Sequence, residues 1–486
     1  MTQNSETSYK KSNKATSSPW LAFSVAALAI MSSALDRGAS NVILPNIAEE
    51  FVSDIPTAQW INTTYLLMVA ALLLPMGRLT DILGSKKVIV SGLIVFLFGG
   101  IASALSPSIE ILLSGRVLQG IGGAMVQGTA FIIAISAFGE RQRGKAVGLV
   151  LIFVGLGNVA GPTVGGLVTT YAGWRSVFIV TSLVSAAGAL LAFLALDSHR
   201  TNQISNSKFD WYGATLCVST LSALLAGIAM TAHFGWSLIP LSVIALSLVS
   251  GGLFVWRGLV TDSPILDLQL FRRPIFGLSI LSNLICFVGM SSALFLLPFY
   301  LKYVQGYPPD KVGSVFIPAA ACMAIVSPLS GRLSDRFGTR IFTVGGSLLV
   351  TIGLIILSTL DESSNGLLPY IAMIPISAGM GAFYGPNNSA ILAVTPTSNQ
   401  SAVIGFINLI RNSGSLIAIP IAATIVTLVM SSMGFEANLS AVNYGSDMEL
   451  ISSFIKGMRI SFVIFTSASL IGMIMSLYPS PKLFEN

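Results

Sequence analysis

The sequence contains one acidic residue, Asp36, that lies well inside a long apolar run, residues 20–45. An ionised carboxylate is costly inside a lipid bilayer, so an acid at such a place is expected to serve a function. A carboxylate in these surroundings can take up a proton and release it again as its neighbours change. The structural alternative is an ion pair that holds two helices together.

Arg116 is the expected partner of Asp36. It lies seven residues into the apolar run 109–138, and Asp36 lies nine residues before Pro45. At about 1.5 Å per residue, both groups lie about 10–14 Å from the same end of their helices. Gln119 and Gln127 continue a polar face of the Arg116 helix toward the interior. For Arg116 the alternative role is simple helix-to-helix contact.

Two further arginines, Arg37 and Arg411, also lie inside apolar runs. Adjacent residues of a helix face different ways, so Arg37 need not pair with Asp36. If Arg37 faces a cavity, it favours an anionic or zwitterionic ligand; otherwise it reaches toward the membrane boundary or neutralises a neighbour. Arg411 belongs to a polar stripe on one helix face, for which a structural role is the main interpretation. The stripe consists of Asn408, Arg411, Asn412 and Ser415.

Composition places these four charges in a membrane. Charged residues make up 9% of the 486 residues, against about 25% in soluble domains, and the mean hydropathy is +0.81. A soluble globular protein is therefore excluded. Apolar runs long enough to cross a bilayer predict fourteen helices. The predicted spans are 20–45, 58–76, 88–105, 109–138, 146–169, 174–196, 211–230, 236–256, 275–300, 312–330, 341–360, 367–394, 402–430 and 457–478.

The distribution of basic residues predicts the orientation. Eighteen of the 26 Lys and Arg residues fall in segments on the side of the N-terminus and five on the other side. The excess of positive charge marks the cytoplasmic side, so both termini are expected there. The tails 1–18 and 481–486 are then cytoplasmic. We expect a multi-pass protein of the cell (inner) membrane, with the lipid bilayer as a partner and no nucleic acid.

The sequence shows no signature of metal binding, ATP coupling or enzymatic catalysis. The two His and three Cys residues show no metal-ligand spacing, so no metal site is expected. No phosphate-binding loop of the G-x-x-x-x-G-K-(S/T) type occurs, which argues against direct coupling to ATP. No catalytic cluster is visible, so a membrane enzyme is disfavoured, as is a sensor that transports nothing.

A ten-residue pattern, G-x-L-x-D-x-x-G-x-(K/R), occurs twice, at 77–86 and 331–340. Each copy separates two apolar runs, and the offset is about half the chain, which predicts a duplicated architecture. The glycines allow a tight turn with positive φ, and the Asp can cap a helix N-terminus. The residues expected to act as a switch are Gly77, Arg78, Asp81, Gly84, Lys86, Gly331, Asp335, Gly338 and Arg340.

The run 146–169 carries glycines at a four-residue spacing, Gly157, Gly161 and Gly165, together with Pro162. Glycines at this spacing line one face and allow another helix to approach closely, and the proline kinks the helix. We expect this face to form a close contact between two halves of the molecule, suited to a rocking motion. Generic close packing is the alternative.

These motifs together resemble the major facilitator superfamily, and in particular its fourteen-span drug:proton antiporters. Residues 112–124, with Arg116, resemble the family's fourth-helix motif, and the glycines of 148–166 resemble its antiporter motif. Leu35-Asp36 with Asn41 and Leu44-Pro45 resembles its first-helix motif, and Trp174-Arg175 opens the sixth span as is common there. Arg37 departs from the family pattern, in which an uncharged residue is usual.

The resemblance implies an all-α membrane protein with the major facilitator fold. The expected segments are a six-helix bundle at 19–200, an inserted two-helix hairpin at 201–260 and a second six-helix bundle at 261–480. The implied function is proton-coupled export of small amphipathic molecules by alternating access, by a monomer that needs no cofactor besides the proton. Export or flipping of an endogenous lipid or an anionic metabolite is the alternative on the same fold.

The resemblance also assigns roles to residues. Asp36 and Arg116 are expected to couple the proton. The absence of an acid from the second-half spans disfavours a divalent cation as substrate. The residues expected to contact substrate are Arg37, Asn41, Gln119, Gln127, Phe287, Phe295, Tyr384, Asn387 and Arg411.

Overall fold

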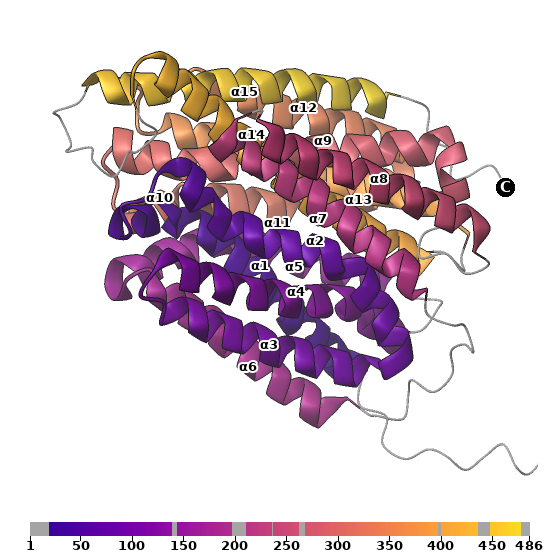
Figure 1. Ribbon diagram of the computed structural model, residues 1–486. Helices are drawn as coiled ribbons and strands as arrows, with labels where there is room; N and C mark the ends of the chain where they lie inside the picture. The colour runs from indigo at the N-terminus through magenta and orange to yellow at the C-terminus, as the bar shows by residue number, and fades with distance from the viewer. Residues whose placement is uncertain are drawn as a thin grey trace, which may run out of the picture.

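The computed structural model describes residues 19–138, 143–196, 210–235, 237–261, 268–396, 400–435 and 448–477. The predicted tails 1–18 and 481–486 lie outside these ranges. The described residues form helices and their connections, with no β-strand among them. Figure 1 shows the helices running roughly side by side as one elongated bundle.

The N-terminal half, drawn in indigo to purple in Figure 1, consists of six long helices. Within it α4 packs on α2 and α3, α1 packs on α5, and α6 covers α3. The helices are α1 (Pro19–Glu50), α2 (Ile55–Leu83), α3 (Ser85–Ala104), α4 (Ile109–Phe138), α5 (Arg143–Ala172) and α6 (Arg175–Ala195).

The C-terminal half repeats these pairings: α13 packs on α11 and α12, α9 packs on α14, and α15 covers α12. One predicted span, 312–330, is broken into α10 and α11, because Pro318 in the first turn of α11 cannot continue a preceding helix. The elements are η3 (Leu268–Arg272), α9 (Pro274–Phe299), η4 (Tyr300–Val304), α10 (Pro309–Ser314), α11 (Ile317–Phe337), α12 (Thr339–Ser358), α13 (Leu368–Ala393), α14 (Gln400–Ser432) and α15 (Met448–Ser476).

Between the halves in sequence lie α7 (Trp211–Phe234) and α8 (Leu238–Val260). They pack on each other as a hairpin, and α7 also contacts α2 of one half and α14 of the other. In Figure 1 this pair crosses the front of the molecule between the two halves. Asp210 caps the first turn of α7 and pairs with Arg257 at the end of α8, which ties the two ends of the hairpin.

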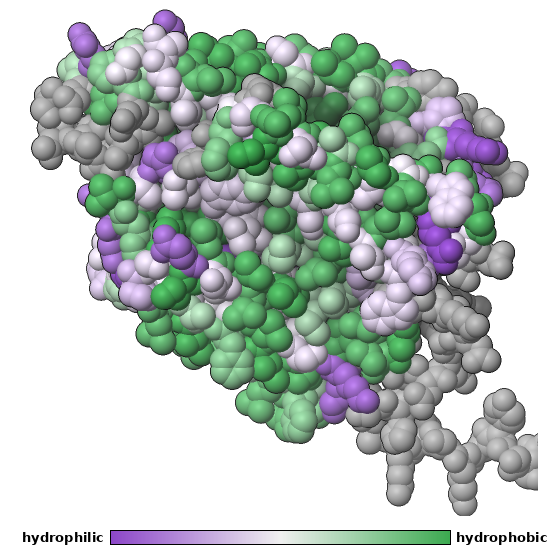
Figure 2. Space-filling view, viewed as in Figure 1, coloured by the Kyte–Doolittle hydropathy of each residue, from purple (hydrophilic) through white to green (hydrophobic). Residues whose placement is uncertain are grey.

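Every predicted span overlaps a helix, and twelve of the described helical segments are long and apolar enough to cross a membrane. Two others, α5 and α13, have 30 and 26 residues but are not among the twelve. The count of fourteen spans therefore stays a prediction. Figure 2 shows hydrophobic surface over the middle of the molecule and hydrophilic residues gathered toward its ends, as a bilayer requires.

The two repeated motifs occupy equivalent places in the two halves. Each forms the end of one helix and the start of the next, with a single glycine between α2 and α3 or between α11 and α12. Gly84 has φ 90° and Gly338 has φ 85°, a backbone conformation that side chains disfavour. The expected Asp cap is wrong for α12, whose N-terminus has no side-chain cap. The motif ends a helix, and the N-cap position is the glycine itself.

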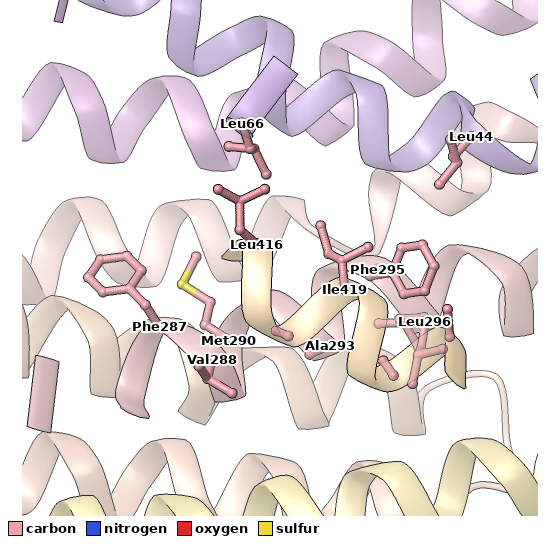
Figure 3. Close-up of a cluster of buried hydrophobic side chains, with 14 of the residues drawn as sticks. Leu44, Leu66, Phe287, Val288, Met290, Ala293, Phe295, Leu296, Leu416 and Ile419 are labelled. Atoms are coloured by element: carbon pink, nitrogen blue, oxygen red, sulfur yellow. The ribbon is translucent and has the colours of Figure 1, made fainter. Parts of the chain in front are cut away.

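The hydrophobic core continues from one half into the other. Figure 3 shows Leu66 of α2 and Leu416 of α14 pointing toward one another, with Ile419 beside Phe295 of α9. All four side chains are buried, with at most 3% of any one exposed. We call this boundary between α1–α6 and α9–α15 the seam. The cavity and part of the polar network described below lie along it.

Candidate functional site

Asp36 of α1 and Arg116 of α4 meet in the interior, as their depths predict. Arg116 Nη1 lies 2.6 Å from Asp36 Oδ2, and neither side chain has any exposed surface. Gln119, one turn further along α4, accepts a hydrogen bond from the same Nη1 at 2.7 Å and donates to Asp36 Oδ1 at 3.3 Å. Thr181 of α6 also donates to Asp36 Oδ1, at 3.3 Å. The carboxylate is thus held by three neighbours on two other helices.

Arg116 is positioned by a second set of contacts. Its Nε donates to the Ile61 carbonyl oxygen of α2 at 3.1 Å, and its guanidinium lies 4.6 Å from the ring centre of Tyr65 and 5.5 Å from that of Phe178. Its Nη2 is buried and has no hydrogen-bond acceptor among the described residues. Removing either partner of a buried ion pair leaves the other charge uncompensated, so loss of the Asp36 carboxylate or of the Arg116 guanidinium is expected to destabilise the fold.

A second polar layer links this cluster to the other half. The Tyr65 hydroxyl lies 2.7 Å from the Ser33 hydroxyl, which also accepts from Gln127 Nε2 at 2.9 Å. Gln127 Oε1 in turn accepts from Arg411 Nη2 at 3.2 Å and from Asn412 Nδ2 at 3.3 Å, both on α14. The chain of bonds therefore crosses the seam from α1 to α14. All four residues of the predicted α14 stripe are buried.

A small cavity lies on the seam beside these residues. Its N-terminal wall includes the predicted residues Arg37, Asn41 and Arg116. Asn41 accepts a hydrogen bond from Asn62 at 2.8 Å on this wall. The complete lining is Arg37, Gly38, Asn41, Asn62, Tyr65, Leu66, Arg116, Ser291, Leu294, Ser415 and Ile419.

The remaining predicted substrate residues lie outside that cavity lining. Gln119 belongs to the Asp36 cluster. Phe287 and Tyr384 pack edge to face with ring centres 5.4 Å apart, and Phe295 packs against Phe299. Asn387 donates to the Ser279 carbonyl and lines a separate small cavity near Arg340. In this conformation α9 lines the cavity with Ser291 and Leu294. The sequence favours the aromatic residues of this helix, so Ser291 and Leu294 were missed.

The glycine face of α5 does not contact the other half, contrary to expectation. A methyl group added at Gly157 would lie 2.5 Å from Ala34 Cβ, and one at Gly161 would lie 2.7 Å from Gly38 Cα. Gly165 likewise packs on Ala39, so the whole stripe lies against α1 of the same half. Its spacing fixes the face of the helix but not the partner.

The contact between halves is made by the adjoining face of α5. Gly166 touches the backbone of α10 at Pro309 and Gly313, and Thr163 donates to the Gly313 carbonyl at 3.3 Å. The carbonyl oxygen of Pro162 also points at Gly313, where an added methyl group would lie 2.7 Å away. The predicted proline therefore contributes to the seam even though the glycine stripe does not.

Polar groups join the halves at the same end of the bundle, which we call the Glu49 end. Lys302 forms an ion pair with Glu49 and donates to the Pro45 carbonyl at 3.4 Å. Tyr303 donates to the same carbonyl at 3.1 Å. Arg175 pairs with Glu50 at 2.6 Å within the N-terminal half.

The repeated turns lie at the opposite end. Lys86 lies 5.4 Å from the ring centre of Phe193, Arg340 lines the small cavity near Asn387, and Asp335 is exposed. Gly77 faces Gly128 of α4, whereas an added methyl group at Gly331 would meet open space. The side chains of Arg78 and Asp81 lie outside the described part of the structure.

Comparison with known proteins agrees with this architecture. The sequence model of the Major Facilitator Superfamily matches residues 26–419. The chain belongs to this superfamily. Crystal structures of a bacterial homologue of the human lysosomal transporter Spinster share its fold; one, inward-facing and unoccupied, gives a TM-score of 0.68 over 94% of this chain and 96% of that chain, at 17% identity.

Curated relatives of this major facilitator protein are named for different compounds. The riboflavin transporter RibZ of Clostridioides difficile is 29% identical over 81% of this chain and 85% of its own length. The multidrug resistance protein Stp of Mycobacterium tuberculosis is 29% identical over 82% of this chain and 74% of its own. The lincomycin resistance protein LmrB of Listeria innocua is 25% identical over 90% and 92%. The protein is thus a multi-pass membrane transporter by family, and the family's members are transporters rather than enzymes.

Proposed function

We propose that this protein is a proton-coupled antiporter that exports small amphipathic molecules by alternating access. It would act as a monomer in the cell (inner) membrane, with fourteen spans and both termini in the cytoplasm. The Glu49 end is then the outer end. The relatives named for multidrug and lincomycin resistance support export, and the relative named for riboflavin shows that the substrate range of similar chains is wider.

The observation that carries the proposal is the buried Asp36–Arg116 pair next to a cavity on the seam. Arg116 lines that cavity while its Nη1 holds Asp36 at 2.6 Å. An acid buried in a membrane domain serves proton transfer in many pumps and transporters. Here its partner is within reach of whatever occupies the cavity, so substrate and proton can compete through one guanidinium.

The proposed cycle follows from this competition. With the outer end open, a proton binds an Asp36 carboxylate oxygen, which removes the negative charge and frees the Arg116 guanidinium from its ion pair. After the halves rock to open the cytoplasmic end, substrate fills the part of the cavity that the freed Arg116 guanidinium had entered. The displaced guanidinium returns to Asp36, and the proton leaves to the cytoplasm. The loaded protein then rocks back, and the next proton on Asp36 sends Arg116 into the cavity again, which releases the substrate to the outside. One proton has moved inward for each substrate moved outward, and no bond other than O–H has changed.

The test is transport in proteoliposomes with an imposed proton gradient. The probes are the anion sulforhodamine B, neutral riboflavin and the cation rhodamine 6G. We expect the wild type to move at least one probe against its gradient only when the proton gradient is present. Asp36→Asn should abolish this dependence, whereas Glu110→Gln, an exposed acid in the first turn of α4, should keep it. Equal gradient-driven transport by Asp36→Asn would refute the proposal.

A second candidate, export or flipping of an anionic lipid or metabolite, is favoured by one feature: Arg37 in the cavity wall. Flipping requires passage of a head group along the seam while the acyl chains stay in the bilayer. Transfer of a fluorescent phosphatidylglycerol analogue between leaflets, measured by dithionite quenching, distinguishes it from export of soluble probes.

A further inference from the structure

The interior of the described bundle carries more positive than negative charge. Asp36 is the only acidic residue within its helices away from their ends, and Arg116 pairs with it. Arg37 and Arg411 remain, and no ion pair with an acid is found for either in the described ranges. Arg37 lines the seam cavity from α1, and Arg411 lies on α14 one turn before Ser415, which lines the same cavity. Each half thus contributes one interior guanidinium that has no ion-pair partner among the described residues.

These guanidinium groups also have unused hydrogen-bond donors. The buried Arg37 Nε and the Nε and Nη1 of Arg411 have no acceptor among the described residues, nor does Arg116 Nη2. Only 2% of the Arg411 surface is exposed. Unpaired charged donors in a dry interior are costly. An oxyanion presents several acceptor lone pairs in a geometry that matches a guanidinium fork.

The donors lie at or beside the seam cavity. Arg37 is part-exposed although it lies in the middle of α1, because it lines this cavity. Arg411 lies one turn before Ser415, another lining residue, and therefore on the same face of α14. Each half contributes one guanidinium, so a ligand held by both would bridge the halves.

The rest of the lining fits the body of an amphipathic molecule. Leu66, Leu294 and Ile419 provide apolar surface from α2, α9 and α14. The hydroxyls of Ser291 and Ser415 lie 2.7 Å apart and hydrogen-bond to each other. This wall therefore does not need a polar ligand group as a hydrogen-bond partner. The charged corner and the apolar wall are thus separated, as a ligand with one charged end requires.

We propose that Arg37 and Arg411 bind the oxyanion head group, a carboxylate, sulfonate or phosphate, of an amphipathic substrate whose apolar part lies against Leu66, Leu294 and Ile419. This assignment rests on the proposed transport function. It makes the preferred substrates anionic. Closing the two arginines around one head group also gives the substrate a means to draw the halves together.

The experiment compares two xanthene dyes of similar size and opposite charge. Sulforhodamine B and rhodamine 6G are titrated by fluorescence polarisation onto the full-length protein in nanodiscs. We expect the wild type to bind sulforhodamine B at least about tenfold more tightly, because a hydrogen-bonded charge is commonly worth that factor or more. Arg37→Gln and Arg411→Gln should each lose about tenfold or more in sulforhodamine B affinity and little in rhodamine 6G affinity.

The controls separate folding from binding. Arg459→Gln, an exposed arginine on α15, should bind both dyes like the wild type. Arg37→Lys and Arg411→Lys should retain part of the preference for the anion, which a merely misfolded variant would not. Equal or tighter binding of rhodamine 6G by the wild type would overturn the assignment. A site that binds only a small inorganic ion would overturn it too. In that case chloride would raise the thermal stability of the wild type but not of the Arg37 and Arg411 variants, and dye binding would be the same in all of them.

The same dyes in the gradient assay tell the two proposals apart. Gradient-driven transport of rhodamine 6G without binding of sulforhodamine B would support the antiporter proposal and refute the anion site. Arginine-dependent binding of sulforhodamine B with transport that ignores the proton gradient would do the reverse.

Discussion

Gly166 offers the sharpest test of how the two halves meet. A methyl group added there would collide with the Pro309 carbonyl oxygen and lie 3.0 Å from Gly313 Cα, across the seam on α10. Both obstacles are backbone atoms, so no side chain can rotate away. Gly166→Ala should therefore oppose the conformation in which α5 and α10 touch, while leaving the interior of each half unchanged.

The size of the effect follows from the cost of overpacking, about 1–3 kcal/mol for a methylene forced into a packed contact. The halves touch at the Glu49 end in this structure, and a state open at that end would lack the contact, so the equilibrium should move toward the open state by about 5- to 150-fold. Gly157→Ala is the matched control. Its methyl group meets Ala34 within the same half, so it should lower stability without favouring either state.

The assay is a distance measurement between spin labels at the Glu49 end. Leu105 and Met448 suit this purpose because they are 74% and 61% exposed and belong to different halves. With the three native cysteines replaced by serine, Gly166→Ala should enrich the long-distance population relative to the parent. An unchanged distribution, or an equal change in Gly157→Ala, would refute the reasoning.

Three further predictions concern single interactions. Asp36→Asn should lower the free energy of unfolding by about 3–5 kcal/mol because it leaves Arg116 charged and unpaired, and adding Arg116→Gln should restore part of the loss in a thermal melt. Lys302→Glu should raise the open population at the Glu49 end, most clearly at low salt, and the exchanged pair Glu49→Lys with Lys302→Glu should reverse this; a change that persists in the exchanged pair would contradict an ion-pair role. Gly338→Ala should cost about 1–3 kcal/mol because φ of 85° suits glycine alone, and a melting temperature equal to that of the wild type would contradict it.

Much of the fold follows from hydropathy and repetition. Long apolar runs predict helices well because a bilayer leaves the backbone few other ways to satisfy its hydrogen bonds. The repeated ten-residue pattern located two equivalent helix ends, one in each half. The break between α10 and α11 was missed, although Pro318 inside the predicted span signalled it.

The site was predictable where charge was scarce. Asp36 and Arg116 stood out because an ionised group in an apolar run is rare, and depth along the helix was enough to pair them. Thr181 and Ser291 were missed because hydroxyls are common in these spans and nothing in their spacing separates them from others. The predicted partner of the α5 glycines was wrong. Helical periodicity shows which residues share a face of the helix, but it does not show which helix packs against that face.

The central claim is that Asp36 carries the coupled proton, and proton release on substrate binding tests it most directly. Purified protein in weakly buffered detergent solution, with a pH indicator, receives sulforhodamine B or rhodamine 6G, and dye binding is followed in parallel by polarisation. The account predicts proton release from the wild type on binding of the preferred dye, and none from Asp36→Asn although the dye still binds. Proton release from Asp36→Asn equal to that from the wild type would contradict it.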